Sequence, residues 1–196
     1  MNKYLMLLII LFCLTFITGC SQENIEQPKV RIVLEDGREI NIELYPEKAP
    51  KTVENFLKLV DEKYYNGVAF HRIIENFMIQ TGGYYVEEAK IREKEEVEPI
   101  IGEFSENGFA TNDILHETGV ISMARTSDFN SAASEFFICS TDNPHLDGKY
   151  AAFGKTIDDE STKIVIDISK SPTRQINNQF PNFPFPVITI KKIERI

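Results

Sequence analysis

The fold is decided by Phe70-His71-Arg72-Ile73-Ile74, which is followed by Phe77-Met78-Ile79-Gln80 and then by Gly82-Gly83. Both longer runs are rich in aromatic and β-branched residues, which favours strands, and the two polar residues between them indicate a bend. Within the second run Met78 and Gln80 share one face, because side chains along a strand alternate with a period of two. The stretch therefore predicts two strands that carry an arginine, a glutamine and large apolar side chains.

Two downstream blocks agree with this stretch. They are Gly119–Thr126 (GVISMART) with Ser134–Ile138 (SEFFI), and Leu146–Lys155 (LDGKYAAFGK). In order and spacing the three blocks resemble the signature of the cyclophilins, a family of peptidyl-prolyl cis-trans isomerases. The resemblance covers about residues 30–196 and implies a mainly β fold, a closed antiparallel eight-stranded barrel with two capping α-helices. Closure of such a barrel would remove exposed strand edges.

The hydrophobic pattern outside the blocks predicts elements that fit such a fold. Residues 30–34 and 40–44 alternate apolar and polar side chains around Asp36-Gly37, a strong hairpin signal. Apolar residues recur at i, i+3, i+4 and i+7 from Val53, which predicts an amphipathic helix over 50–61. Further strands are predicted over residues 68–74, from residue 77, over 134–139 and over 187–193, and a second helix over 160–170.

Isomerisation of an Xaa-Pro bond breaks no covalent bond, so it requires no nucleophile, metal or cofactor. The barrier comes from amide resonance and is roughly 18–20 kcal/mol. In the twisted transition state the prolyl nitrogen regains a lone pair, and a donor aimed at it would stabilise that state more than the planar one. The resemblance implies that Arg72 is this catalytic donor, and arginine suits the role because it is always charged and only donates.

The resemblance also implies a substrate-binding groove. It places Phe77, Met78, Phe137 and Leu146 around the proline ring, and Gln80, Ala124 and Arg125 along the substrate backbone. Any one of the apolar residues taken alone would be read as core packing. His145 and Tyr150 stand at the pocket rim, where many eukaryotic members carry tryptophan and histidine. The tryptophan is associated with tight cyclosporin binding, so weak binding of the drug is expected.

Glu135 departs from the family pattern, which has glutamine at this position. An ionised carboxylate only accepts hydrogen bonds, whereas an amide also donates. If Glu135 faces the groove, it cannot donate to a substrate carbonyl, but it could hold Arg72 or Arg125. Alternatively, it is a tolerated polar replacement that points to water.

The N-terminus carries a second strong pattern. Lys3 is followed by an apolar run over residues 5–17 and then by Thr18-Gly19-Cys20. A positive start, a short apolar core and small residues before the cysteine resemble a bacterial lipoprotein signal. We expect a signal peptide over residues 1–19, a lipid on Cys20 at the start of a polar tether over 20–28, and an isomerase domain over 29–196. The alternative is a plain signal peptide with a chance cysteine.

Composition restricts the partners. The net charge of −9 becomes −10 once Lys3 is removed, which argues against nucleic acid and against anionic lipid headgroups as partners. Contact with the membrane would therefore rest on the Cys20 lipid. In the mature chain the remaining cysteine, Cys139, is expected as a small buried hydrophobe. The three histidines have no metal-ligand spacing, and His71 is expected as a buried core histidine.

The stretch 84–104 replaces the glycine-rich loop that is usual in the family. It is dense in glutamate, lysine and arginine, and such charge runs are usually solvated faces. The more specific interpretation is a substrate-selecting flap beside the groove.

These observations together predict a lipid-anchored isomerase outside the cytoplasm. Its partners would be Xaa-Pro segments of exported proteins that are folding at the membrane surface. The alternative is a holdase that binds proline peptides with weak or no catalysis, because of Glu135. A membrane-tethered scaffold that uses the charged stretch is a third, weaker hypothesis.

Overall fold

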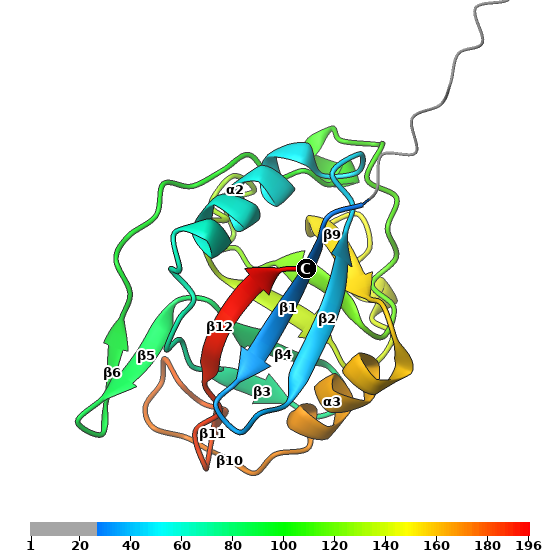
Figure 1. The fold of residues 1–196 in the computed structure, drawn as a ribbon. Coiled ribbons are helices and arrows are strands. Elements are labelled where there is room, and N and C mark those ends of the chain that lie inside the picture. Colours follow the sequence, from blue (N-terminus) through cyan, green and yellow to red (C-terminus); the bar gives the residue numbers. More distant parts are fainter. Residues whose placement is uncertain (1–26) are drawn as a thin grey trace, which may run out of the picture.

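The computed structural model describes residues 27–196. The predicted signal peptide over 1–19, Cys20 and most of the predicted tether lie outside these residues. Figure 1 shows a curled sheet flanked by two helices. The strands are β1 (Lys29–Leu34), β2 (Glu39–Leu44), β3 (Arg72–Ile74), β4 (Met78–Thr81), β5 (Tyr84–Glu87), β6 (Lys90–Glu93), β7 (Val120–Met123), β8 (Phe136–Cys139), β9 (Ala152–Thr156), β10 (Thr173–Arg174), β11 (Phe183–Pro184) and β12 (Ile190–Arg195). The helices are α2 (Pro50–Asp61) and α3 (Asp159–Ser169), and 3₁₀ turns span Ser105–Asn107 and Pro144–Leu146.

Eight of these strands form one antiparallel sheet in the order β12-β1-β2-β9-β7-β8-β4-β3. The predicted closed barrel is wrong: the sheet is a curled half-barrel whose end strands β12 and β3 do not pair. The predicted strand over 68–74 shortens to Arg72–Ile74. At the outer edge of β3, Ile73 N donates at 3.0 Å to the carbonyl oxygen of Asn182, the residue before β11. Residues 67–70 make only scattered backbone bonds to residues 188–190, so no ladder closes the seam.

Both predicted helices are present. The apolar face of α2 packs on the core, where the Phe56 ring lies 5.2–5.4 Å from the rings of Tyr65, Phe136 and Phe153. The first turn of α2 receives its cap from a distant residue. The buried Glu103 carboxylate accepts from the backbone N–H of Lys51 at 3.1 Å and of Thr52 at 2.8 Å. A negative group at a helix N-terminus satisfies free N–H groups and complements the helix dipole.

The four strands β3, β4, β8 and β7 form two alternating rows of side chains. One row is Ile73, Ile79, Ile138 and Ile121, all fully buried in the main core. The next row, one residue along each strand, is Arg72, Gln80, Phe137 and Ser122. Because successive side chains point to opposite faces, the second row lies on the side of the sheet away from that core. The strand register alone thus places an arginine, a glutamine and a phenylalanine side by side.

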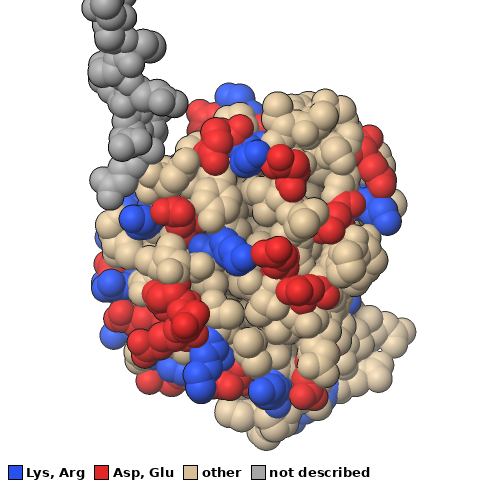
Figure 2. All heavy atoms as spheres, turned by 90° about the vertical axis from the view of Figure 1, so that its right-hand side faces the viewer, with Lys and Arg blue, Asp and Glu red and all other residues tan. Residues whose placement is uncertain are grey.

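The charged stretch 84–104 folds as a hairpin followed by an extended segment. β5 and β6 pair through a tight turn at Glu88-Ala89, both with positive φ, and the hairpin projects from the body of the molecule (Figure 1). Figure 2 shows acidic side chains spread over one face of the molecule with basic ones among them. Across residues 27–196 no helix combines the length and apolar character that a membrane span needs.

Candidate active site

A pocket of about 280 Å³ opens on the side of the sheet away from the main core. Its lining comes from β3, from β4 and the residue before it, from β8, from the segment after β7, and from the second 3₁₀ turn and the segment after it. The lining residues are Arg72, Phe77, Met78, Gln80, Ala124, Arg125, Phe137, Leu146 and Tyr150. The structure therefore brings together nine of the eleven groove residues that the sequence predicts. The other two, Glu135 and His145, lie just outside this lining.

The floor of the pocket is apolar. Met78, Phe137 and Leu146 are at most 6 % exposed and form a cluster of their own with Cys139, separate from the main core. Burial raises the pKa of the Cys139 thiol to about 12, so this cysteine is uncharged and packs as a small hydrophobe, as predicted. The floor is therefore a small, continuous apolar surface.

Arg72 stands half-buried at the edge of this floor. Its register partner across the strand pair is Gln80, and one terminal guanidinium nitrogen donates to Gln80 Oε1 at 3.1 Å. Among residues 27–196 this is the only hydrogen bond of the guanidinium, so its other N–H groups are open to the pocket. Burial lowers the pKa of Arg72 from its ordinary value, but an arginine stays protonated at neutral pH. A charged donor therefore faces the apolar floor.

Glu135 acts on the same glutamine from the other side. Its Oε2 accepts from Gln80 Nε2 at 2.8 Å and lies 3.3 Å from Nε2 of the buried His71. Burial raises the pKa of Glu135, but the contacts with His71 and Gln80 outweigh it and hold the pKa below its usual value. The carboxylate does not simply point to water. It reaches Arg72 through Gln80, and its acceptor-only chemistry turns the Gln80 carbonyl toward the arginine.

The rim of the pocket is an aromatic and cationic frame. The guanidinium carbon of Arg125 lies 4.6 Å from the ring centroid of Tyr150, and this guanidinium donates to the carbonyl oxygen of Lys149 at 2.8 Å and that of Thr126 at 2.8 Å. Arg125 is therefore engaged with the protein's own groups, and its predicted role along the substrate stays a prediction. His145 lies outside the pocket with its ring stacked on Phe77 at 5.6 Å.

A second, larger hollow of about 850 Å³ adjoins the pocket and shares Gln80, Ala124 and Arg125 with it. We call it the acidic groove, because five carboxylates and two basic side chains line it. The charged lining residues are Glu93, Glu95, Glu96, Asp128, Glu135, Lys94 and Arg125. Part of the charged stretch 84–104 thus forms a wall of the groove, while the hairpin tip stays a solvated face.

Sequence reasoning missed one part of the site. Behind the pocket floor, the buried His116 ring contacts Asp147 and Ser122. Asp147 and Ser122 lie inside the motif blocks, but no spacing connects them with His116, since the contact depends on how two loops pack. Within residues 27–196 no group of three or more His, Cys, Asp or Glu side chains is placed to hold a metal ion.

Comparison with known proteins identifies what this chain is similar to. The model of the family "Cyclophilin type peptidyl-prolyl cis-trans isomerase/CLD" matches residues 29–195. A peptidyl-prolyl cis-trans isomerase of Acinetobacter baylyi is 39 % identical over 159 residues, 78 % of this chain and 79 % of the relative. Peptidyl-prolyl cis-trans isomerase A of Dickeya dadantii is 36 % identical over 162 residues, 80 % of this chain and 79 % of the relative.

Solved structures agree with the sequence relatives. The crystal structure of a cyclophilin-type peptidyl-prolyl cis-trans isomerase from Cryptosporidium parvum superposes with a TM-score of 0.68 at 26 % identity, covering 87 % of this chain and 98 % of the other. A structure of the same protein determined in the presence of the dipeptide Ala-Pro superposes with a TM-score of 0.67 at 30 % identity, over 84 % and 96 % of the two chains.

Proposed function

This chain belongs to the cyclophilin-type peptidyl-prolyl cis-trans isomerases, and from this membership we propose that it isomerises Xaa-Pro bonds of exported proteins at a bacterial membrane surface. The isomerase activity is that of the family. One observation supports it best within the chain itself: a pocket of about 280 Å³ with an apolar floor is lined by the paired Arg72 and Gln80. The exported substrates and the membrane rest on the N-terminal sequence.

The pocket suggests how isomerisation proceeds. A proline ring packs on Met78, Phe137 and Leu146, which places the prolyl nitrogen beside Arg72. As the amide twists, the nitrogen regains its lone pair and accepts a hydrogen bond from the guanidinium. This bond is absent in the planar amide, so it stabilises the transition state selectively. Gln80 holds the guanidinium in place and limits its freedom before the substrate arrives.

Magnitudes show that Arg72 does not act alone. Uncatalysed exchange takes tens to hundreds of seconds. Reaching milliseconds requires about 10⁴-fold, or roughly 5.4 kcal/mol at 1.36 kcal/mol per decade. A hydrogen bond to a charged group contributes about 1.5–3 kcal/mol. The remainder has to come from holding the ring in a water-excluding pocket, which strengthens the bond and orients the amide.

The proposed location depends on Cys20. A diacylglycerol on this cysteine, with the tether over 20–28, would hold the domain outside the cytoplasm on a bacterial membrane. A single acyl chain binds membranes marginally, whereas two or more chains hold firmly. The acidic protein gains no attraction from anionic headgroups, so the lipid would supply the membrane binding.

Two measurements test this function. The first compares exchange rates of a proline peptide with its equilibrium binding, using the protein purified in detergent. Acceleration supports the isomerase, whereas binding without acceleration would favour the holdase.

The second measurement addresses the anchor. Cells that express the wild type or Cys20→Ser are fed labelled fatty acid, and we expect label in the wild type alone. Equal labelling of Cys20→Ser would refute the anchor but leave the isomerase untouched.

A further inference from the structure

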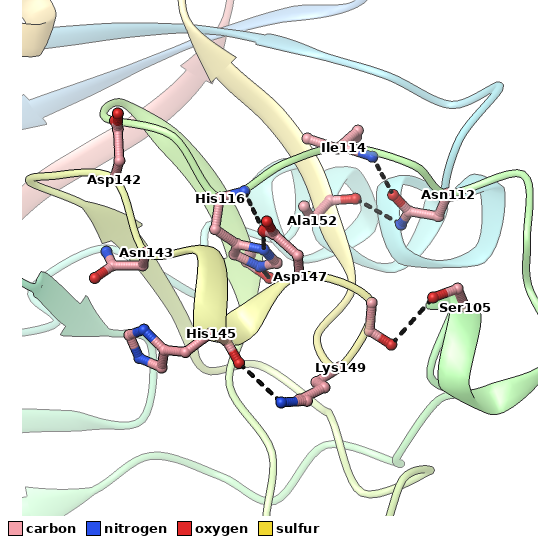
Figure 3. A network of polar contacts seen from close by, with 12 residues as sticks. Ser105, Asn112, Ile114, His116, Asp142, Asn143, His145, Asp147, Lys149 and Ala152 are labelled. Atoms are coloured by element: carbon pink, nitrogen blue, oxygen red, sulfur yellow. Dashed lines mark hydrogen bonds and ion pairs between the residues drawn. The ribbon is translucent and has the colours of Figure 1, made fainter.

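A buried polar network lies behind the proline pocket. His116 Nδ1 is 3.1 Å from Asp147 Oδ1 (Figure 3). His116 Nε2 is 3.1 Å from Ser122 Oγ. Asp147 can only accept, so Nδ1 carries the proton and Nε2 accepts from the serine hydroxyl. Burial lowers the pKa of His116 more than the Asp147 contact raises it, which keeps the ring neutral.

The hydrogen-bonded arrangement of Asp147, His116 and Ser122 resembles a hydrolytic triad, but the burial of these residues excludes that chemistry. Ser122 is 0 % exposed and His116 is 1 % exposed, so no acyl group can reach the hydroxyl. A nucleophile must contact its substrate, and this one is covered by the pocket floor. The network therefore acts on the protein and not on a ligand.

The network touches the proline pocket directly. The His116 ring stacks on the Phe137 ring at 6.1 Å with an interplanar angle of 18°, and it meets the Tyr150 ring edge-on at 6.5 Å. Ser122 is the register partner of Phe137 on the neighbouring strand. One ring thus supports both the floor and the rim of the pocket from behind.

His116 also anchors the pocket wall at two points. The wall is the segment 143–147, which presents Leu146 to the proline ring. At one end, Asn143 N donates to His116 O at 2.8 Å, and at the other, His116 N donates to Asp147 Oδ1 at 2.7 Å. Figure 3 shows the Asp147 carboxylate turned inward to His116, whereas the His145 ring points away. The wall is therefore attached to residue 116 at both ends.

We propose that His116, through Asp147 and Ser122, is a positioning residue that sets the width of the proline pocket and hence the affinity for the proline ring. This inference rests on the isomerase function proposed above. In this inference the network contributes to substrate binding. It does not contribute to twisting of the amide at Arg72, which lies on the opposite side of the pocket.

Three variants separate positioning from general stability. Asp147→Ala removes the acceptor for both His116 donors, and Asp147→Asn is the matched control, because its Oδ1 still accepts both. His116→Phe keeps the stacking on Phe137 and the backbone bonds to Asn143 and Asp147, but it loses the ring contacts with Asp147 and Ser122. The protein is purified in detergent, and its fold is checked by circular dichroism. The dissociation constant of an Ala-Pro peptide and its exchange rate on the enzyme at saturation are measured by NMR.

We expect Asp147→Ala and His116→Phe to weaken peptide binding about three- to tenfold, while the exchange rate at saturation stays within about twofold. Asp147→Asn should restore the affinity. If His116→Phe fails to fold, the pair of variants at Asp147, whose side chain is partly exposed, still decides. Unchanged affinity in a folded Asp147→Ala protein would overturn the inference, as would a loss confined to the exchange rate. Loss of all exchange in the wild type would instead refute the isomerase function.

Discussion

The proline pocket and the acidic groove are neighbours with opposite construction. The pocket is small and apolar at its floor, and the register of β3, β4 and β8 places four of its lining residues, Arg72, Met78, Gln80 and Phe137. The groove is about three times larger and takes its walls from irregular segments after β6 and between β7 and β8. They share Gln80, Ala124 and Arg125, which form the boundary between them.

This difference assigns separate roles to the two hollows, catalysis to the pocket and substrate preference to the groove. A residue held by strand register cannot move without shifting the sheet, so the pocket suits the one feature that all substrates share, the proline ring. The groove carries charges on loops, where side chains can vary without disturbing the sheet. The pocket should therefore determine the rate, and the groove should determine which flanking residues are preferred.

The largest expected effect lies in the pocket. Arg72→Ala should lower kcat/KM at least about tenfold, at least 1.4 kcal/mol of transition-state stabilisation, because the donor to the prolyl nitrogen is lost. Arg72→Lys should not fully restore the rate, since the planar fork that Gln80 holds is missing. Peptide exchange is measured by NMR, and circular dichroism checks that each variant is folded. Full activity of a folded Arg72→Ala protein would remove Arg72 from the mechanism.

A smaller effect is expected at the boundary. Glu135→Leu leaves Gln80 without its acceptor and should lower kcat/KM by about two- to tenfold, the equivalent of one net hydrogen bond of roughly 0.5–1.5 kcal/mol. Glu135→Gln is the isosteric control and should stay close to wild type, because its carbonyl still accepts. A several-fold gain in Glu135→Gln would mean that the carboxylate withholds a donor from the substrate.

The pH dependence of stability follows from the same carboxylate. The folded pKa of Glu135 is below its ordinary value, so the unfolded chain binds its proton first as pH falls. Its contribution to stability should be complete above the ordinary glutamate pKa and disappear as pH drops through the folded one. Urea unfolding from neutral to acidic pH should show a shallower acid loss in Glu135→Gln. Parallel pH curves for the two proteins would contradict the shift.

The smallest effect belongs to the groove. Its excess of carboxylates should favour peptides with a basic side chain near the proline. Replacing Glu93, Glu95 and Glu96 by glutamine should reduce the preference for a lysine-containing peptide over its glutamine analogue by about two- to threefold at low salt. High salt should abolish the preference in the wild type, because exposed charges are screened. A preference that survives high salt would have to arise from shape.

Local patterns in the sequence predicted most of the elements. The Asp36-Gly37 hairpin and the helix at 50–61 were confirmed because turn chemistry and helical periodicity act within a few residues. Barrel closure was wrong because it depends on pairing between β3 and β12, which are far apart in the sequence and which no local pattern connects. The strand-like residues over 68–74 indicated a single strand, but residues 67–70 make only scattered backbone bonds to residues 188–190, and β3 bonds Asn182, which precedes β11.

Prediction of the site residues succeeded and failed for the same physical reasons. The motif blocks named the pocket residues, and strand register explains the placement of those on β3, β4 and β8. They did not indicate where the Glu135 carboxylate points, since that depends on His71 and Gln80 from other strands. They also gave no sign of His116, whose partners come together only when the loops at 116 and 143–147 pack.

The distant cap on α2 has a consequence for motion. The acceptor for the amides of Lys51 and Thr52 is Glu103, four residues beyond the groove-wall residue Pro99. If this segment lifts from the body, the first turn of the helix loses its partner at the same moment. Deuterium uptake at these two amides should therefore report groove opening from α2, a helix that lines neither the pocket nor the groove.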